Sequence, residues 1–388
     1  MIMADNNENK VLNVPHLRFP EFTEEWEETT LGKISEITKG SGISKDQLSE
    51  QGSPCILYGE LYTKYKSEII DEVYSRTELD SSSLVKSKAN DVIIPCSGET
   101  AIDISTARCV PFNNILLGGD LNIIRLKHDD GGFFAYQLNG ARKKDIARVA
   151  QGVSVVHLYG ENLKHIRVYH PAIEEQKKIT RLLSLIDERI ATQNKIIEDL
   201  KKLKSAISLK MLHSDSWEQF KIQDIASIGR GRVISSVEIS QQENPLYPVY
   251  SSQTSNDGIM GYLDDFMFEG EYISWTTDGA NAGTVFYRNG KFNCTNVCGL
   301  LKLKKGFDAH FVSLVLAEAT RMYVSTNLAN PKLMNNTMGN IQIRLPKLEE
   351  QKRISVVFRK LHGLLETHNS LIIKYSKQKQ YLLSQMFI

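Results

Sequence analysis

The hydrophobic positions of one stretch follow a helical pattern, and the chain contains this stretch twice. The first copy covers residues 171–212 and the second covers residues 346–387, at a constant offset of 175 residues (346 − 171) without a gap. Both copies open with Pro, two residues, Glu-Glu-Gln-Lys, a basic residue and Ile. Pro at the first helical position with Glu in the first turn is typical of a helix start. We therefore predict two long helices.

Each predicted helix has one apolar stripe, in alternating steps of three and four residues that are typical of a coiled-coil seam. Gln193 and Lys204 interrupt the first seam, and His368 and Lys379 interrupt the second at the same offset. Because a single apolar stripe must be buried, we expect the helices to pack together, with two unrelated amphipathic helices as the alternative. The seam residues are Ile179, Leu183, Ile186, Ile190, Ile197, Leu200, Ile354, Phe358, Leu361, Leu365, Ile372 and Tyr375.

A second repeat marks the start of each unit. Trp26 begins the sequence WEETTLGKISEITKGSGIS, and Trp217 begins WEQFKIQDIASIGRGRVIS, 191 residues later (217 − 26). Short apolar runs between Gly, Asn, Asp and Ser clusters then predict strands, and residues 133–150 and 307–328 predict helices. Each unit is expected to begin with a short helix near its Trp. The fold class predicted is a mixed α/β (α+β) domain that occurs twice, each followed by a long helix.

These patterns divide the chain into a tail, two globular parts and two helices. The predicted segments are an N-terminal tail at 1–21, a first domain at 22–169, a first long helix at 170–214, a second domain at 215–344 and a second long helix at 345–388.

Composition narrows the class of protein. The chain has 388 residues, 41% of them apolar and 24% charged, as in ordinary globular proteins of two or three domains. Its net charge of +1 gives no general basic signal, so any contact with nucleic acid must be local. We find no membrane-length apolar run and no signal-peptide pattern. Five cysteines, an odd number, fit a reducing compartment, and we expect a cytoplasmic protein.

The doubled helix opening P-x-x-E-E-Q-K-[KR]-I, the Trp-Glu start of each unit and the alternation of variable domain with repeated helix carry a family resemblance. Together they resemble the specificity (S) subunit of type I restriction-modification systems, over essentially the whole chain after the tail. The resemblance implies that each globular part is a target recognition domain for one half of a split double-stranded DNA sequence. It also implies that the helices dock two methyltransferase (M) subunits, and that two nuclease-translocase (R) subunits complete the restriction enzyme.

Helix geometry agrees with this reading. A helix of about 40 residues is roughly 60 Å long, and an antiparallel pair would place the two domains at opposite ends, related by a pseudo-two-fold axis. DNA rises about 34 Å per turn, so two such domains could address half-sites about one turn apart. Because the two domains differ in length and sequence, we expect an asymmetric bipartite target. The many basic residues of the first helix are either a solvated face or part of the docking surface.

Candidate DNA contacts come from polar loops that offer donors and acceptors for bases, or cations and hydroxyls for phosphates. For each of these loops a solvated surface turn is the alternative interpretation. The candidates in the first domain are Lys39, Ser41, Ser44, Lys45, Tyr58, Glu60, Tyr62, Lys64, Ser97, Thr100 and Arg108. Those in the second domain are Arg230, Arg232, Tyr250, Ser252, Gln253, Thr254, Thr276, Thr277 and Asn281.

No motif predicts catalysis by this chain. Asn244-Pro245-Leu246-Tyr247 resembles the N-P-P-[YF] motif of adenine methyltransferases but lacks the second Pro, and we find no glycine-rich turn for a methyl donor. Cys294 and Cys298 have no second ligand pair at zinc spacing, so two small thiols are expected there. We predict a non-catalytic subunit without cofactor or metal. S-adenosylmethionine, ATP and Mg²⁺ would belong to partner subunits, as the resemblance implies.

Two alternatives remain open. One is a self-contained DNA adenine methyltransferase with its own specificity domain, in which the Asn244–Tyr247 segment is the active loop; it predicts that the isolated chain binds a methyl donor. The other is a coiled-coil scaffold without a role in DNA binding. It predicts that the chain and a methyltransferase together protect no defined sequence.

Overall fold

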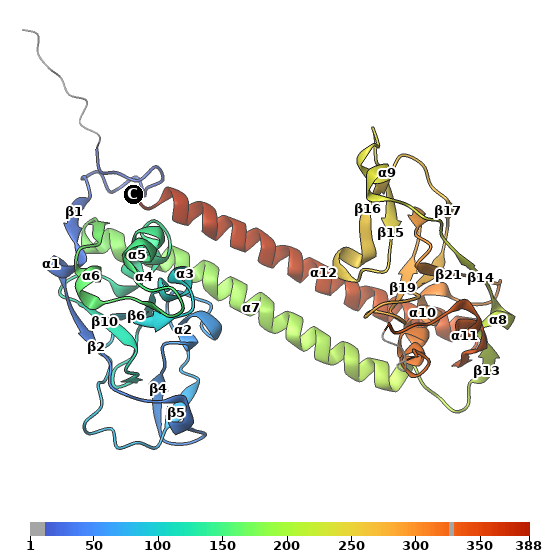
Figure 1. Cartoon of the computed structure of the whole chain (residues 1–388), viewed down its shortest axis with the longest axis horizontal. Coiled ribbons are helices and arrows are strands. Elements are labelled where there is room, and N and C mark those ends of the chain that lie inside the picture. The colour runs from blue at the N-terminus through green and yellow to red at the C-terminus, as the bar shows by residue number, and fades with distance from the viewer. Residues whose placement is uncertain (1–11, 326–329) are drawn as a thin grey trace, which may run out of the picture. The chain divides into compact units, whose positions relative to one another are not determined.

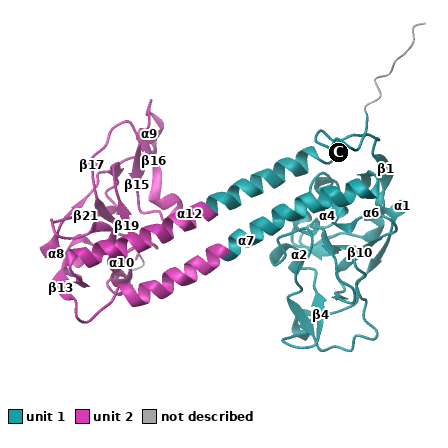
Figure 2. Ribbon diagram, turned by 180° about the vertical axis from the view of Figure 1, so that it is seen from behind, with its two compact units in different colours: residues 1–195, 369–388 teal, residues 196–368 magenta. Residues whose placement is uncertain are grey.

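The computed structural model describes residues 12–325 and 330–388, which form two compact units (Figures 1 and 2). Unit 1 contains the chain up to Lys195 together with Asn369–Ile388, and unit 2 contains Ile196–His368. Both long helices contribute residues to both units. The expectation of a polar tail falls partly on residues 1–11, which lie outside the described residues.

The two long helices are confirmed as α7 (Ile173–Met211) and α12 (Leu348–Gln385). The prediction that a Pro occupies the first helical position is wrong by two residues. The helix is capped at Ala172, whose carbonyl accepts the backbone N–H of Gln176 at 3.1 Å. Pro171 therefore precedes the cap, and its own carbonyl is free to accept a side chain.

Unit 1 contains two four-stranded sheets, of order β2-β10-β6-β8 and β3-β5-β4-β9. A two-stranded pair, β1 with β12, leads into α7. The strands are β1 (Glu27–Thr30), β2 (Ser35–Lys39), β3 (Leu48–Ser49), β4 (Ser53–Ile56), β5 (Ser75–Thr77), β6 (Asp91–Pro95), β7 (Ser97–Gly98), β8 (Arg108–Val110), β9 (Leu116–Leu117), β10 (Leu121–Leu126), β11 (Val156–His157) and β12 (Arg167–His170). The helices before α7 are α1 (Leu31–Ile34), α2 (Glu60–Thr63), α3 (Ala101–Ile104), α4 (Gly131–Asn139), α5 (Lys143–Val149) and α6 (Gly160–Lys164).

Unit 2 repeats the central sheet as β14-β21-β18-β19 and the leading pair as β13 with β22, which leads into α12. Its second sheet, of order β16-β15-β20-β17, repeats three strands of the unit 1 sheet and has its fourth strand at the opposite edge. The duplicated mixed α/β domain is therefore confirmed. The strands are β13 (Glu218–Lys221), β14 (Ala226–Arg230), β15 (Tyr247–Tyr250), β16 (Ile259–Leu263), β17 (Phe268–Glu269), β18 (Tyr272–Thr276), β19 (Val285–Arg288), β20 (Lys291–Cys294), β21 (Cys298–Leu303) and β22 (Gln342–Leu345). The helices before α12 are α8 (Ile222–Ile225), α9 (Ser236–Ser240), α10 (Ala309–Ala319) and α11 (Asn335–Asn340).

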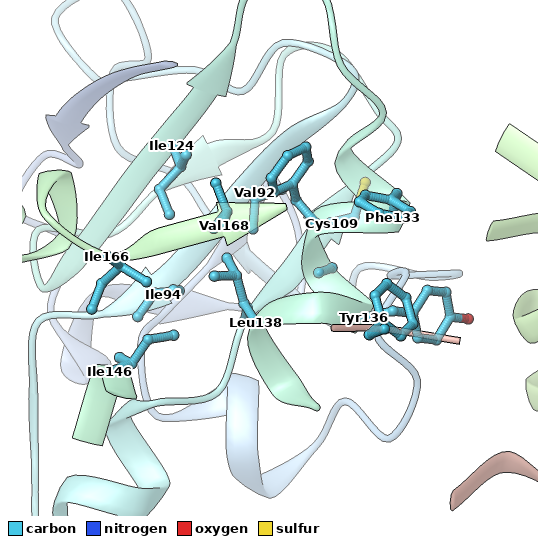
Figure 3. Packing of buried hydrophobic residues seen from close by; sticks show 14 of the residues in the cluster. Val92, Ile94, Cys109, Ile124, Phe133, Tyr136, Leu138, Ile146, Ile166 and Val168 are labelled. Atoms are coloured by element: carbon cyan, nitrogen blue, oxygen red, sulfur yellow. The ribbon is translucent and has the colours of Figure 1, made fainter. Parts of the chain in front are cut away.

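The main core of unit 1 joins its central sheet, α4 and both long helices. Figure 3 shows its sheet and α4 side chains, with Phe133 and Tyr136 among them. Ile179 at the start of α7 and Met386 after the end of α12 belong to this same cluster. Since the beginning of one helix meets the end of the other, the helices are antiparallel within unit 1. Each fully buried aliphatic side chain contributes about 1.5–3 kcal/mol to stability.

The core of unit 2 shows the same antiparallel arrangement. Ile207 and Met211 near the end of α7 pack in one cluster with Ile354 and Phe358 near the start of α12. The predicted coiled-coil packing is thus observed in each unit. In unit 1 the seam's polar interruption Lys379 is held by carboxylates, with its Nζ 2.6 Å from Asp187 and 2.5 Å from Glu68 of the globular domain.

Three local predictions were wrong or incomplete. Each unit begins with a strand after its Trp, and only then a single helical turn, α1 or α8. The helix predicted over 133–150 is two helices, because the chain turns at Gly140, whose φ and ψ of −94° and −100° are not helical. The helix predicted over 307–328 ends at Ala319 and continues as a 3-10 turn to Met322, and residues 326–329 lie outside the described residues.

A buried glutamine joins each globular domain to its long helix in the same way. In unit 1 the side chain of Gln176 accepts the N–H of Asp130 at 2.9 Å and donates to the Pro171 carbonyl at 2.9 Å. In unit 2 Gln351 accepts the N–H of Asp308 at 3.0 Å and donates to the carbonyl two residues before α12, at 2.8 Å. Asp130 and Asp308 are the N-caps of α4 and α10. The repeated Glu-Glu-Gln sequence therefore fixes the position of each helix against its domain.

The remaining chemistry is simple. All five cysteines are buried and free. Within residues 12–325 and 330–388, no three His, Cys, Asp or Glu side chains form a group that could hold a metal ion. Among the helices of that same part of the chain, none is long and apolar enough to cross a bilayer.

Candidate nucleic-acid interface

Three segments that are distant in the sequence lie side by side at one end of the unit 1 sheets. β4 pairs in parallel with β9, and Ser41 bridges in parallel to Gly118 just beyond β9. The backbone N–H of Ser41 donates to the Leu117 carbonyl at 2.9 Å, and that of Gly118 donates to the Ile56 carbonyl at 2.9 Å. The loops that follow these strands therefore emerge together.

These loops surround a groove of about 860 Å³. Its lining comes from residues 42–48, 57–64 and 118–120, and includes five of the candidates from the sequence, Ser44, Lys45, Tyr58, Glu60 and Lys64. A cation, a hydroxyl and an aromatic edge on neighbouring loops form a surface suited to phosphate and base contacts.

A glycine allows two backbone segments to cross in close contact beside the groove. A Cβ added at Gly40 would lie 1.9 Å from the carbonyl oxygen of Gly118, so no other residue fits without moving the backbone. Lys39 directly precedes this crossing and is exposed. The fold therefore fixes the place of one cation beside the groove.

Two of the candidates in unit 1 support the groove from inside. Glu60 is buried, and its carboxylate accepts the N–H of Leu57 at 3.0 Å and the Lys64 ammonium at 2.6 Å. Arg108 is buried and donates to the carbonyls of Leu61 and Tyr65 at 3.0 and 2.8 Å. The expectation that both lie on exposed loops is corrected, because their polar atoms are used to hold the loop 57–74 in place.

The other candidates of unit 1 reach the surface to different extents. Burial raises the pKa of Tyr62, with smaller contributions from Tyr58, Glu99 and Asp103, so its hydroxyl remains a donor at neutral pH. The exposed ones are Lys39, Ser44, Lys45, Lys64 and Thr100, and the half-buried ones are Ser41, Tyr58, Tyr62 and Ser97.

Unit 2 repeats the glycine crossing. A Cβ at Gly231 would lie 1.6 Å from the carbonyl oxygen of Cys294, and Arg232 bridges in parallel to Thr295. Arg230 ends β14 just before the crossing, where its Nε donates to the Asn335 side chain at 2.9 Å. The two domains therefore place a basic residue at the same point of the fold.

The loop 251–258 of unit 2 is held by a buried arginine. Arg288 lies with its guanidinium carbon 3.6 Å from the ring centroid of Tyr250, and it donates to Asp257 at 2.8 Å and to Ser274 at 3.0 Å. The Gln253 side chain donates to the carbonyl of Ile259 at the start of β16. Thr254 is exposed at the tip, and Ser252 is half-buried.

Three candidates of unit 2 are either buried or bonded within the domain. Thr276 and Thr277 are buried, and the Thr277 hydroxyl donates to the Val297 carbonyl at 3.0 Å, which corrects the expectation of an exposed loop there. Arg232 makes two hydrogen bonds to the Glu238 carboxylate, which lower the pKa of Glu238. Asn281 is exposed.

Strand pairing adds surface residues that the sequence reading missed. β11 pairs with Ser97 and Gly98, and the rings of His157 and Tyr159 stack beside it at 6.1 Å, both exposed. In unit 2 Lys332 bridges to Asp278. Composition does not reveal such pairings. The 175-residue offset relates His157 to Lys332, so it could have identified the two residues as equivalent positions of the two units.

The Asn244–Tyr247 segment is the start of a hairpin. The backbone N–H of Leu246 donates to the Leu263 carbonyl at 3.0 Å, in line with the pairing of β15 and β16. The Asn244 N–H donates to the Asp264 carboxylate at 2.9 Å. Leu246 is 71% exposed, so this segment lies at the surface and leads into the strand β15.

Comparison with known proteins gives a consistent result. The family described as Type I restriction modification DNA specificity domain matches residues 23–202 and again 214–374. A candidate type I specificity subunit of Mycoplasma pneumoniae is 35% identical over 233 residues, 58% of this chain and 97% of the relative. The specificity subunit of the type I restriction enzyme MpnII from the same organism is 41% identical over 177 residues, 44% of this chain and 53% of the relative.

Among solved structures, the S subunit of a type I restriction-modification system from M. genitalium has the same fold. The TM-score is 0.73 at 18% sequence identity, and the match covers 97% of this chain and 99% of the other.

Proposed function

Because the chain belongs to the type I restriction-modification DNA specificity domain family, we propose that it is the DNA-recognition subunit of a type I restriction-modification complex. Each of its two domains reads one half of an asymmetric bipartite DNA target, and the long helices set the spacing and dock methyltransferase subunits. One observation carries this proposal: the two domains share the strand order of their central sheet and the glycine crossing but differ in the loops beside the crossing.

The subunit recognises DNA and leaves the chemistry to its partners. The family match covers both halves of the chain, and the relatives reported above are specificity subunits. The alternative of a self-contained adenine methyltransferase is not favoured, because its supposed active loop is the exposed start of a hairpin.

The partners follow from this role. Methyltransferase subunits and double-stranded DNA are the direct partners, and we propose two M subunits and two R subunits in the full restriction enzyme. The proposed recognition domains are residues 22–169 and 215–344. Support for two docking positions comes from the duplication, since each domain is joined to its helix by the same buried glutamine.

The proposed DNA surface of the first domain is the groove and its rim. Lys39, Ser44, Lys45, Tyr58 and Lys64 supply cations, a hydroxyl and an aromatic edge there. In the second domain, the exposed or half-exposed candidates beside the equivalent crossing take the same role. They are Arg230, Tyr250, Ser252, Thr254 and Asn281.

A domain exchange tests the proposal. Residues 22–168 are replaced by the corresponding domain of a relative, and methylated adenines are mapped across the genome of cells that carry the chain with its methyltransferase. We expect one half-site to change while the other half-site stays the same. Methylation that follows no split sequence, or a change in both half-sites, would contradict it, and methyl-donor binding by the isolated chain would favour the methyltransferase alternative.

A further inference from the structure

The two domains repeat one basic position at the edge of the central sheet. Lys39 is the last residue of β2 and pairs with Asn122, and Arg230 is the last residue of β14 and pairs with Gly299. They are 191 residues apart (230 − 39), the same offset that relates Trp26 to Trp217. Both directly precede the glycine that lets two backbones cross. The fold therefore holds one cation at the same point in each domain.

The loops beside this position differ between the domains. Residues 57–74 connect β4 to β5 in unit 1, whereas only residues 251–258 connect the equivalent β15 to β16 in unit 2. Residues 96–107 connect β6 to β8, whereas the shorter segment 277–284 connects β18 to β19. Two different half-sites require two different readers, and these loops are where the domains diverge.

A basic side chain that occupies the same position in both domains should contact a feature that is present in both half-sites. The sugar-phosphate backbone is the same at every base pair, and contacts to it position a protein without reading sequence. We infer that Lys39 and Arg230 are matched phosphate anchors, one for each half-site, and that base reading belongs to the loops that differ. This inference rests on the proposed function.

The neighbouring basic residues do not meet the same criterion. Arg232 is neutralised by two hydrogen bonds to Glu238, and the equivalent residue of the first domain is Ser41, whose hydroxyl accepts the Val85 N–H at 2.8 Å. Lys45 has Ser236 as its counterpart at the same offset. Of these three pairs of equivalent positions, only that of Lys39 and Arg230 is basic in both domains.

The local contacts of Arg230 suit a phosphate anchor. Its Nε donates to the Asn335 side chain at 2.9 Å and its Nη1 donates to the Asn296 carbonyl at 3.5 Å. A guanidinium has five N–H donors, so these bonds orient the group and leave donors for a phosphate oxygen.

The test uses the whole chain assembled with its methyltransferase subunits. Lys39→Ala, Arg230→Ala and the double variant are titrated with target DNA and with unrelated DNA over a range of salt concentrations. Each single variant should reduce the slope of log K against log salt by about 0.9, which is about an eightfold loss of affinity at about 0.1 M salt. The loss should be equal for target and unrelated DNA, and Lys39→Arg should restore binding.

Lys33→Ala and Lys305→Ala are the controls, because these exposed lysines lie just beyond the opposite ends of the same strand pairs. They should leave the salt slope unchanged. Methylation mapping of all variants should give the original half-sites. An unchanged salt slope, or a relaxed base preference at one half-site, would overturn the phosphate role while leaving the proposed function intact. Failure of the unaltered complex to select any split sequence would instead overturn the proposed function.

Discussion

Arg288 is a buried cation that supports an exposed loop, and its removal should affect one half-site alone. It stacks on Tyr250 and bonds to Asp257, which has a left-handed φ of 53° at the loop tip. Arg288→Lys keeps the charge but loses the flat stack and the forked donors. We expect relaxed base preference at the half-site read by the second domain, with the first half-site unchanged, in methylation mapping.

The corresponding control for Arg288 is a cation in the other domain. Arg76→Lys alters an exposed arginine of β5 whose Nη1 donates to the Gly52 carbonyl. It should leave the second half-site unchanged. If Arg288→Lys relaxed the base preference equally at both half-sites, the loop 251–258 would not be the segment that reads the second half-site.

His310 should make unit 2 less stable in mild acid. Burial, and to a smaller extent the nearby charges of Arg359, His362 and Lys204, lower the pKa of His310 to about 4 against the opposing effect of Asp308. In the unfolded chain the imidazole has a pKa near 6.5. Between these values the unfolded state binds a proton that the folded state does not, so stability falls as pH falls from 6.5 to 4.

The size and source of this acid effect can be measured by chemical denaturation. We expect a loss of about 2 kcal/mol across that range, after allowing for partial exposure of the ring. His310→Gln should remove most of it, and His128→Gln, at an exposed histidine of unit 1, should not. A pH dependence that persists in His310→Gln would exclude this histidine as its source.

At the scale of elements, the hydrogen bonds of Gln176 and Gln351 predict that removing either glutamine destabilises the contact between its domain and the long helix. Gln176→Ala would leave the N–H of Asp130 and the carbonyl of Pro171 buried without their present partners. We expect a loss of about 2–4 kcal/mol from the buried unsatisfied groups and the cavity. Gln351→Ala should cost a similar amount in unit 2. Hydrogen exchange should show the loss in α4 for the first variant and in α10 for the second.

The controls for these hydrogen bonds are the exposed residues that follow each glutamine. Lys177→Ala and Lys352→Ala remove solvated side chains, so changes should stay within about 0.5 kcal/mol. If the free energy of unfolding of both glutamine variants changed no more than that of these controls, the glutamine hydrogen bonds would have no role in stability.

The elements that could be predicted from the sequence are those with a long regular pattern. The helices α7 and α12 each run for about ten turns, and the ends of both were predicted to within three residues. Short strands such as β6 and β18 were found because buried apolar runs mark them. The glutamine hydrogen bonds were not foreseen, because a polar residue in a helix start gives no sign of which distant cap it binds.

The candidate interface was predicted less completely, for a physical reason. Loop polarity selected Lys39 and Arg230, which reach the surface, but it also selected Arg108 and Thr277, which bond to backbone carbonyls inside their domains. An isolated polar residue has the same identity whether it faces solvent or caps a carbonyl. Only the strand pairing, which brings distant segments together, separates the two cases.

At the scale of the whole molecule, duplication allows one function to be divided among repeated and divergent parts. The central sheet, the glycine crossing and the glutamine contact with the long helix occur twice, whereas the loops 57–74 and 251–258 differ. Under the proposed function, the repeated parts suit tasks that both half-sites share, namely folding, docking and phosphate contact. Divergent parts are free to read different bases.

The length of the long helices should therefore set the distance between half-sites without altering their sequences. We consider four residues inserted after Lys195 in α7 and after Ser370, its repeat counterpart, in α12. Four residues add about 6 Å of helix and a rotation of about 40°, close enough to a full turn to keep the seam buried. At 3.4 Å per base pair, the spacer should grow by about one or two base pairs. Methylation mapping should find both half-sites unchanged, and Lys195→Ala with Ser370→Ala should leave the spacer at its original length. New half-sites with an unchanged spacer would show that the helices do not set the distance.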